Sequence, residues 1–232
     1  MLQFPQRAAR MAAVSFTTGS PMTDLSQDGQ PQLSKHRIEA LVDGIFAVAM
    51  TLLVIDLRLP EHAHLASEAA LREALAALVP NLISWLISFF VLAIFWIANH
   101  RLYSYVRHAD ARLLWLTILS LSGASLLPFA SAVNSQFVSS TGQAIYSGVM
   151  IWLSVSTLLV ARHIHRHPGL CAHPMSAGTY RATLVRGCGV MLIAALALLI
   201  SHVVPGKANY VFALMAVLRP LGAHVERRMS LA

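Results

Sequence analysis

The first long apolar run of the chain contains a carboxylate, and this combination most constrains what the chain can fold into. Residues 37–60 read RIEALVDGIFAVAMTLLVIDLRLP, with Asp43 near the beginning of the run. About 20 predominantly apolar residues are long enough to cross a bilayer as a helix. Because a charged group is costly in lipid, Asp43 should face protein or water. The run therefore predicts a membrane-spanning helix that carries a polar site.

Further apolar runs of similar length follow, and composition agrees with them, since 56% of the residues are hydrophobic and 12% are charged. That balance is more apolar than an ordinary soluble domain requires. The sequence predicts an all-α integral membrane protein with six transmembrane helices, in a domain over residues 35–226. Residues 1–34 are rich in Gln, Ser, Thr, Pro and Gly and predict a disordered cytoplasmic tail. The predicted spans are 38–59, 78–99, 112–132, 143–162, 183–204 and 208–225.

The basic residues are distributed unequally between the two sides that these spans define. Of the 17 Lys and Arg residues, all but Arg58, Arg72 and Lys207 fall on one side if the spans alternate in direction. The positive-inside rule assigns that side to the cytoplasm, together with both termini. Nucleic-acid binding is the competing interpretation of a basic chain, but these charges are scattered over short loops that would face lipid headgroups. We therefore expect a multi-pass protein with the lipid bilayer and no nucleic acid as partner. The dominance of Arg over Lys and the abundance of Ala indicate a bacterium of high GC content, and thus an inner-membrane location.

No pattern in the sequence indicates catalysis. A nucleotide-binding loop, a nucleophile elbow and an HExxH motif are all missing from the sequence. The histidines at 163, 165, 167 and 173 could in principle bind a metal, but they have no carboxylate or thiolate partners at fixed spacing. We predict no enzyme activity, no cofactor and no metal site.

The first span has a narrow stripe of side chains that is a candidate ion path. At about 100° per residue, Val48, Thr51, Leu52 and Ile55 share this stripe, whereas Asp43 lies about 140° round from Val48. If several copies of the stripe converged on an axis, their apolar rings would form a constriction that gates by dewetting, and Thr51 would supply a ring of hydroxyl oxygens. Spacing alone favours ordinary packing between transmembrane helices as the explanation of the same stripe.

Two segments resemble a known family. Residues 37–60 look like the first helix of bacterial six-helix members of the lysosomal and endosomal potassium channel (transmembrane protein 175-like) family, whose hallmark is R-x-x-x-F-S-D. Arg37, Asp43 and Gly44 match, and Thr51 and the LLVID run follow. Residues 95–105, FWIANHRLYSY, resemble the family's W-x-x-[HN]-H-R-L-[FY] signature. The matching positions there are Trp96, Asn99, His100, Arg101, Leu102 and Tyr103.

The chain departs from the first motif at two positions. Leu41 and Val42 stand where the family has Phe and Ser, so one apolar anchor is smaller and one hydroxyl is lost. Asp43 remains able to pair with His100 or Arg101, because these residues lie at the cytoplasmic end of adjacent antiparallel spans. We assign five residues to a structural brace at that end, outside the ion path: Arg37, Asp43, Trp96, His100 and Arg101.

The resemblance implies a homotetrameric potassium channel that lacks a TVGYG filter and lines its central pore with the first helix. Carried over by position, the pore and selectivity residues are Val48, Thr51, Leu52 and Ile55. Val48 replaces the Ile or Leu that is common in the family, which widens the ring and predicts a modest preference for potassium over sodium. Asp56 would attract cations at the outer mouth, although pairing with Arg58 or contact with headgroups would also satisfy it.

Two other functions remain open. A secondary transporter would usually show internal repeats and interrupted helices, and the sequence has no convincing three-plus-three repeat. A noncatalytic membrane scaffold would suit the scarcity of intramembrane charge after the second span. Coupled, saturable flux would indicate the transporter, and no flux at all would indicate the scaffold.

Overall fold

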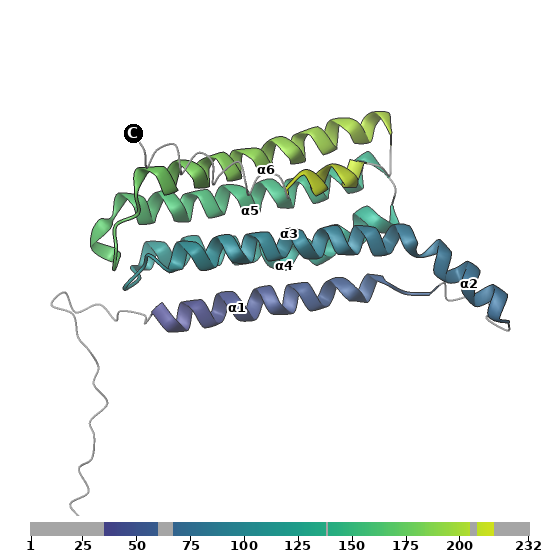
Figure 1. The fold of residues 1–232 in the computed structure, drawn as a ribbon, viewed down its shortest axis with the longest axis horizontal. Helices are drawn as coiled ribbons and strands as arrows, with labels where there is room; N and C mark the ends of the chain where they lie inside the picture. Colours follow the sequence, from purple (N-terminus) through teal and green to yellow (C-terminus); the bar gives the residue numbers. More distant parts are fainter. Residues whose placement is uncertain (1–34, 60–66, 138, 205–207, 216–232) are drawn as a thin grey trace, which may run out of the picture. The chain divides into compact units, whose positions relative to one another are not determined.

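The computed structural model describes residues 35–59, 67–137, 139–204 and 208–215, and this part of the chain is helical (Figure 1). The predicted tail, residues 1–34, lies outside it. The elements are α1 (Lys35–Leu52), the 3₁₀ helix η1 (Leu53–Asp56), α2 (Glu68–Ala77), α3 (Val79–Tyr103), α4 (Ala111–Gln136), α5 (Ser140–Arg166), η2 (Pro168–Leu170), α6 (Ala177–Val203) and η3 (Ala208–Leu214).

Five helical segments are long and apolar enough to cross a membrane, which confirms the all-α membrane fold class. They are Lys35–Asp56, Val79–Tyr103, Ala111–Gln136, Ser140–Arg166 and Ala177–Val203. Each overlaps one predicted span, and α4 continues through Pro128 without ending there. Of the sixth predicted span, 208–225, residues Ala208–Leu214 form η3, and the part after residue 215 lies outside the described residues.

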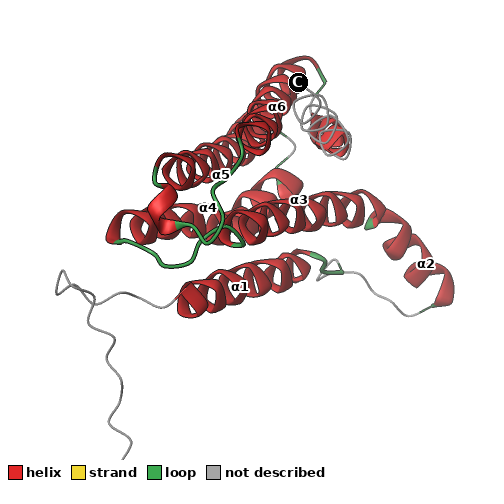
Figure 2. Cartoon of the chain, turned by 60° about the vertical axis from the view of Figure 1, so that its left-hand side comes forward, coloured by secondary structure: helices red, strands yellow, loops and turns green. Residues whose placement is uncertain are grey.

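The helices pack in a chain of neighbours. α1 contacts α3 and α4, α4 contacts α5, α5 contacts α6, and η3 lies against α3 and α6. In Figure 2, α3 and α4 stand between α1 and the pair formed by α5 and α6. α1 therefore has neighbours on one side only within the described part of the subunit.

Small residues allow α4 and α5 to approach closely. A Cβ atom at Gly123 would lie 2.6 Å from a ring carbon of Trp152, so this position has no room for a side chain. The Trp152 indole donates a hydrogen bond to the Leu119 carbonyl across the same contact, at 3.0 Å. Close approach at small residues is the usual way in which transmembrane helices gain packing energy, because lipid removes the hydrophobic driving force between them.

Side-chain caps begin four of the helices. Asp110 accepts a hydrogen bond from the Leu113 amide at 2.8 Å at the start of α4. Serines do the same at the start of α2, α5 and α6. Each cap satisfies an amide that the first helical turn leaves without a partner. The capping residues are Ser67, Asp110, Ser139 and Ser176.

The loops after α3 and α5 are joined through their backbones at one end of the helices. The Arg107 amide donates to the Leu170 carbonyl and the Ala172 amide donates to the Tyr105 carbonyl, both at 2.8 Å. We call this end, where α3 and α5 finish and α4 and α6 begin, the arginine-rich end. Its arginines are Arg101, Arg107, Arg112, Arg162, Arg166 and Arg181.

Candidate functional site

One face of α1 and η1 is packed inside the subunit. Its side chains are at most 3% exposed and contact α3 and α4. They recur every three or four residues, which is the spacing that places side chains on a single face of a helix. This packed face consists of Ile38, Val42, Phe46, Ala49 and Leu53.

The opposite face carries all four of the predicted pore residues. Val48 is 55% exposed, Leu52 is 43% exposed, Ile55 is 48% exposed, and Thr51 is also exposed. Packing within the described part of the subunit therefore does not account for the stripe. The stripe is therefore open to lipid or to another copy of the chain.

Small residues lie beside the stripe on the exposed face of α1. Ala40, Gly44 and Ala47 are exposed beside the stripe, and a Cβ atom at Gly44 would meet nothing within 4 Å. Bulky side chains are exposed as well, both on α1, where Leu41 is 43% exposed, and on other helices, where Trp115 is 69% exposed. Small residues are enriched where transmembrane helices approach each other. The exposed face of α1 therefore offers small residues at which another helix could approach closely.

The Thr51 hydroxyl is exposed and hydrogen-bonded within its own helix. It donates a hydrogen bond to the Val48 carbonyl, at 2.8 Å. The donated proton leaves the lone pairs of the oxygen available, because a hydroxyl has one donor and two acceptor sites. An exposed hydroxyl oxygen of this kind can face a cation.

Asp56 lies at the end of η1, one residue beyond the stripe, and is half-buried. The Arg58 guanidinium donates to the Ile55 carbonyl at 3.0 Å. In the described residues Arg58 forms no ion pair with Asp56, so the direct pairing that the sequence left open is not observed in the subunit.

Part of the predicted brace is brought together. The Trp96 indole donates a hydrogen bond of 2.8 Å to the Asp43 carboxylate and so links α1 to α3. The rings of Trp96 and His100 have their centroids 6.0 Å apart. In the part of the chain described, Asp43 forms no ion pair with Arg37, His100 or Arg101. The indole, and not a basic group, is therefore the observed partner of the carboxylate.

The two departures from the family motif lie on different faces of α1. Val42 is buried in the packed face, whereas Leu41 is exposed. The hydroxyl that Val42 replaces would thus lie among apolar side chains of the same subunit. Leu41 lies on the side of the stripe and is 43% exposed.

Sequence reasoning missed a set of hydrogen bonds in the core. Ser88 of α3 is bonded to Ser131 of α4 at 2.9 Å and to the Tyr146 hydroxyl of α5 at 3.1 Å. Tyr103 and Thr117 form a second buried pair between α3 and α4. Hydroxyl groups within apolar spans are the signal that could have pointed to these bonds, since polar side chains commonly join transmembrane helices.

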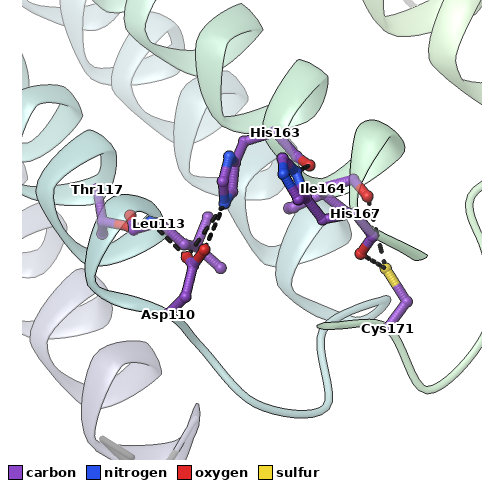
Figure 3. Close-up of polar contacts among 7 residues, drawn as sticks. All are labelled: Asp110, Leu113, Thr117, His163, Ile164, His167 and Cys171. Atoms are coloured by element: carbon purple, nitrogen blue, oxygen red, sulfur yellow. Dashed lines mark hydrogen bonds and ion pairs between the residues drawn. The ribbon is translucent and has the colours of Figure 1, made fainter. Parts of the chain in front are cut away.

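A second polar cluster joins α4 to α5 at the arginine-rich end (Figure 3). The His163 ring nitrogen Nε2 lies 3.0 and 3.1 Å from the two carboxylate oxygens of Asp110, the residue that also caps α4. The His163 and His167 rings have their centroids 4.3 Å apart, and His167 Nδ1 lies 2.9 Å from the His163 carbonyl. These contacts hold the last turn of α5 against the start of α4.

His165 also has contacts within the subunit. His165 stacks on Tyr180 of α6, with ring centroids 4.4 Å apart, and its Nδ1 lies 3.2 Å from the Met175 carbonyl. Among the residues that the structure describes, no three His, Cys, Asp or Glu side chains are grouped as metal ligands would be.

Comparison with known proteins identifies the family. The family model described as "Endosomal/lysosomal potassium channel TMEM175" matches residues 37–128. A potassium channel of Streptomyces collinus is 31% identical over 155 residues, which cover 65% of this chain and 74% of that protein. The endosomal/lysosomal proton channel TMEM175 of Gallus gallus is 34% identical over 110 residues, covering 45% of this chain and 22% of the relative.

A solved structure has the same fold. The crystal structure of a lysosomal potassium-selective channel TMEM175 homologue from Chamaesiphon minutus superposes with a TM-score of 0.68 at 22% identity, over 81% of this chain and 97% of that one. The matched sequence region contains α1, α3 and the first part of α4, and thus the exposed stripe and the Asp43–Trp96 bond. The chain belongs to the endosomal/lysosomal potassium channel TMEM175 family, a family of ion channels and not of enzymes.

Proposed function

We propose that this membrane protein conducts potassium through a central pore lined by α1 and η1 of four copies of the chain. One observation carries the proposal. The stripe of Val48, Thr51, Leu52 and Ile55 lies on the face of the first span that has no neighbour in the described subunit, while the opposite face is packed.

A single exposed helix cannot enclose water, so the proposal requires several copies to meet. The small residues Ala40, Gly44 and Ala47 beside the stripe would let adjacent copies of α1 approach closely. The number four comes from the family resemblance and not from the subunit.

Apolar rings would form the constriction. Val48 and Leu52 lie about 6 Å apart along α1, from a rise of about 1.5 Å per residue. Ile55 follows about 6 Å further along the 3₁₀ helix η1, where the rise is about 2.0 Å per residue. The sequence has no TVGYG segment, so rings of this kind would replace a carbonyl filter and control wetting of the pore. Thr51 would provide hydroxyl oxygens at the same level, and Asp56 would raise the local cation concentration at the mouth.

Proton conduction is a second candidate. It is supported by the name of the Gallus gallus relative, a proton channel, which is similar to this chain over 110 residues. A narrow water-filled constriction would carry protons as well as potassium. Measuring proton and potassium flux on the same vesicles would separate the two.

The arrangement of charges supports an orientation. We propose that both termini and the arginine-rich end are cytoplasmic, in a bacterial inner membrane, because the arginines of the loops after α3 and α5 lie at one end. No cofactor is required for this function, since potassium itself is the permeant species.

Potassium and sodium flux through the purified chain in liposomes tests the proposal. Thr51→Ala should reduce the preference for potassium because the hydroxyl ring is lost, and Leu52→Asn should increase flux because a polar ring is easier to wet. Ser122→Ala is the matched control for the first variant, since the exposed Ser122 hydroxyl makes a similar bond to the Leu119 carbonyl on α4. Leu126→Asn, at an exposed position of α4, is the control for the second.

Unchanged flux and selectivity in both α1 variants would contradict the pore assignment. Saturable flux coupled to a second ion would indicate a secondary transporter. The complete absence of flux from the folded chain would leave a membrane scaffold.

A further inference from the structure

A cavity of about 610 Å³ lies between α3, α5 and α6, away from the exposed face of α1. Its walls are mostly apolar, and Met215 closes part of it. Prominent apolar side chains along the walls are Phe90, Ile94, Ile97, Leu158 and Val190. The described lining contains no Asp or Glu side chain, so no carboxylate there repels an anion.

Basic and hydroxyl groups line the same cavity. Arg101 comes from the last turn of α3, and Arg186 comes from the third turn of α6. Thr179 and Thr183 lie on the α6 wall. Thr157 of α5 is 6% exposed, and its hydroxyl has no hydrogen-bond partner among the described residues. A buried hydroxyl without a partner is unfavourable unless a ligand or water supplies one.

The two arginines belong to the same end of the membrane. Arg101 already lies at the arginine-rich end, where α3 finishes. Arg186 begins deeper, but side chains of a helix lean toward its N-terminus, and the N-terminus of α6 is at that same end. Long basic side chains near a helix end extend to the headgroup level in this manner.

We propose that this cavity binds an anionic phospholipid, with its phosphate at Arg101 and Arg186 and an acyl chain along the apolar walls. Arginine suits phosphate because its planar guanidinium offers paired donors. Basic pockets between transmembrane helices are the sites at which anionic headgroups bind. A phospholipid fits better than free phosphate because most of the cavity wall is apolar and would remain unfilled by an inorganic ion.

The sequence predicts that Arg101 belongs to the brace with Asp43, whereas the structure places Arg101 in the wall of this cavity. Asp43 of α1 is bonded to Trp96, whereas Arg101 lines a cavity with α5 and α6. The lipid site and the candidate ion path therefore use different helices, and lipid binding can be measured without any flux.

Native mass spectrometry of the full-length chain, after incubation with equal amounts of phosphatidylglycerol and phosphatidylcholine with the same acyl chains, tests the proposal. Wild type should retain phosphatidylglycerol preferentially. Arg101→Gln and Arg186→Gln should each lower that preference about fivefold, the effect of roughly one favourable basic contact. Arg162→Gln, at an exposed arginine outside the cavity, should leave it unchanged.

Three results would overturn the proposal. One is equal retention of the two lipids by wild type, and another is an equal loss of preference in Arg162→Gln, which would indicate general surface charge. The third is displacement of phosphatidylglycerol by glycerophosphate at matched concentration, which would indicate a free phosphate site. If either Gln variant fails to fold by circular dichroism, Arg101→Lys with Arg186→Lys keeps the charge but loses the paired donors, and should weaken the preference less than the Gln variants do without abolishing it. Ala98→Leu fills the apolar wall and should reduce retention of the lipid, and normal retention by that variant would also contradict the site.

Discussion

Val48 is smaller by one methylene than the Ile or Leu that the family resemblance implies at its position. At 55%, it is also more exposed than Leu52 and Ile55. In a ring formed by the same residue from several copies of the chain, each copy lacks the same methylene. The effect of that methylene on the width of the ring is therefore repeated once per copy. In the pore that we propose, the size of this residue would set how wide the ring is and how easily it holds water.

Replacing Val48 by Leu should slow ion flux severalfold and raise the preference for potassium over sodium. The larger side chain narrows the ring and makes it harder to wet. Liposome flux of both ions measures the effect, with Val155→Leu at an exposed position of α5 as the control. Faster flux in Val48→Leu would show that this side chain does not narrow the path.

Trp96→Phe should lower stability without changing ion preference. It removes the indole donor to Asp43 at 2.8 Å, a loss of about 1 kcal/mol for one hydrogen bond. Thermal unfolding in detergent measures the first effect, and the potassium-to-sodium flux ratio measures the second. A changed ratio with unchanged stability would place Asp43 and Trp96 in the ion path and not in a brace.

At the scale of elements, the Asp110 side chain makes two different interactions at the start of α4. It caps the helix and contacts the ring of His163, which is buried at the end of α5 (Figure 3). The cap is formed within α4 itself, whereas His163 lies 53 residues further along the chain. Loss of this carboxylate therefore weakens both α4 and its attachment to α5.

Asp110→Ala should destabilise the protein by about 1–2 kcal/mol through the lost cap alone. Asp110→Asn retains a capping oxygen and should cost less, since it loses only the charge opposite His163. Thermal unfolding of the two variants in the same detergent compares them. Equal losses would mean that the cap contributes little and that the contact with His163 dominates.

The sequence was informative about the first span because periodicity is a local property. The stripe of Val48, Thr51 and Ile55 and the packed residues Phe46 and Ala49 follow directly from the helical repeat. The positions of five spans follow from hydropathy in the same way.

Features that depend on distant neighbours could not be predicted. The bond between Ser88 and Ser131 joins residues 43 positions apart, and no pattern within either span specifies the partner. The pairing of Asp43 with Trp96, and not with His100 or Arg101, is of the same kind, since it depends on how α1 is rotated against α3. The lipid cavity likewise exists only once three helices are assembled.

At the scale of the whole molecule, orientation in the membrane can be measured at Cys171. Burial raises the pKa of the Cys171 thiol above its usual range, and the residue lies in the loop between α5 and α6. Because alkylation requires the thiolate, labelling of this site in a Cys188→Ala background should be slow at neutral pH and accelerate as the pH rises.

A membrane-impermeant maleimide should label Cys171 in inverted vesicles and not in intact cells. Labelling in intact cells would reverse the proposed topology.

The central claim is that copies of the chain bring the exposed face of the first span together around the ion path. Cadmium block of potassium flux through Thr51→Cys, with both native cysteines replaced by Ala, tests this most directly. Thiolates from adjacent copies would converge and bind the metal ion, so cadmium should stop the flux of Thr51→Cys, and a chelator should restore it. The Ser122→Cys control should remain conducting. Persistent flux through Thr51→Cys under cadmium, at a level equal to that control, would contradict the claim.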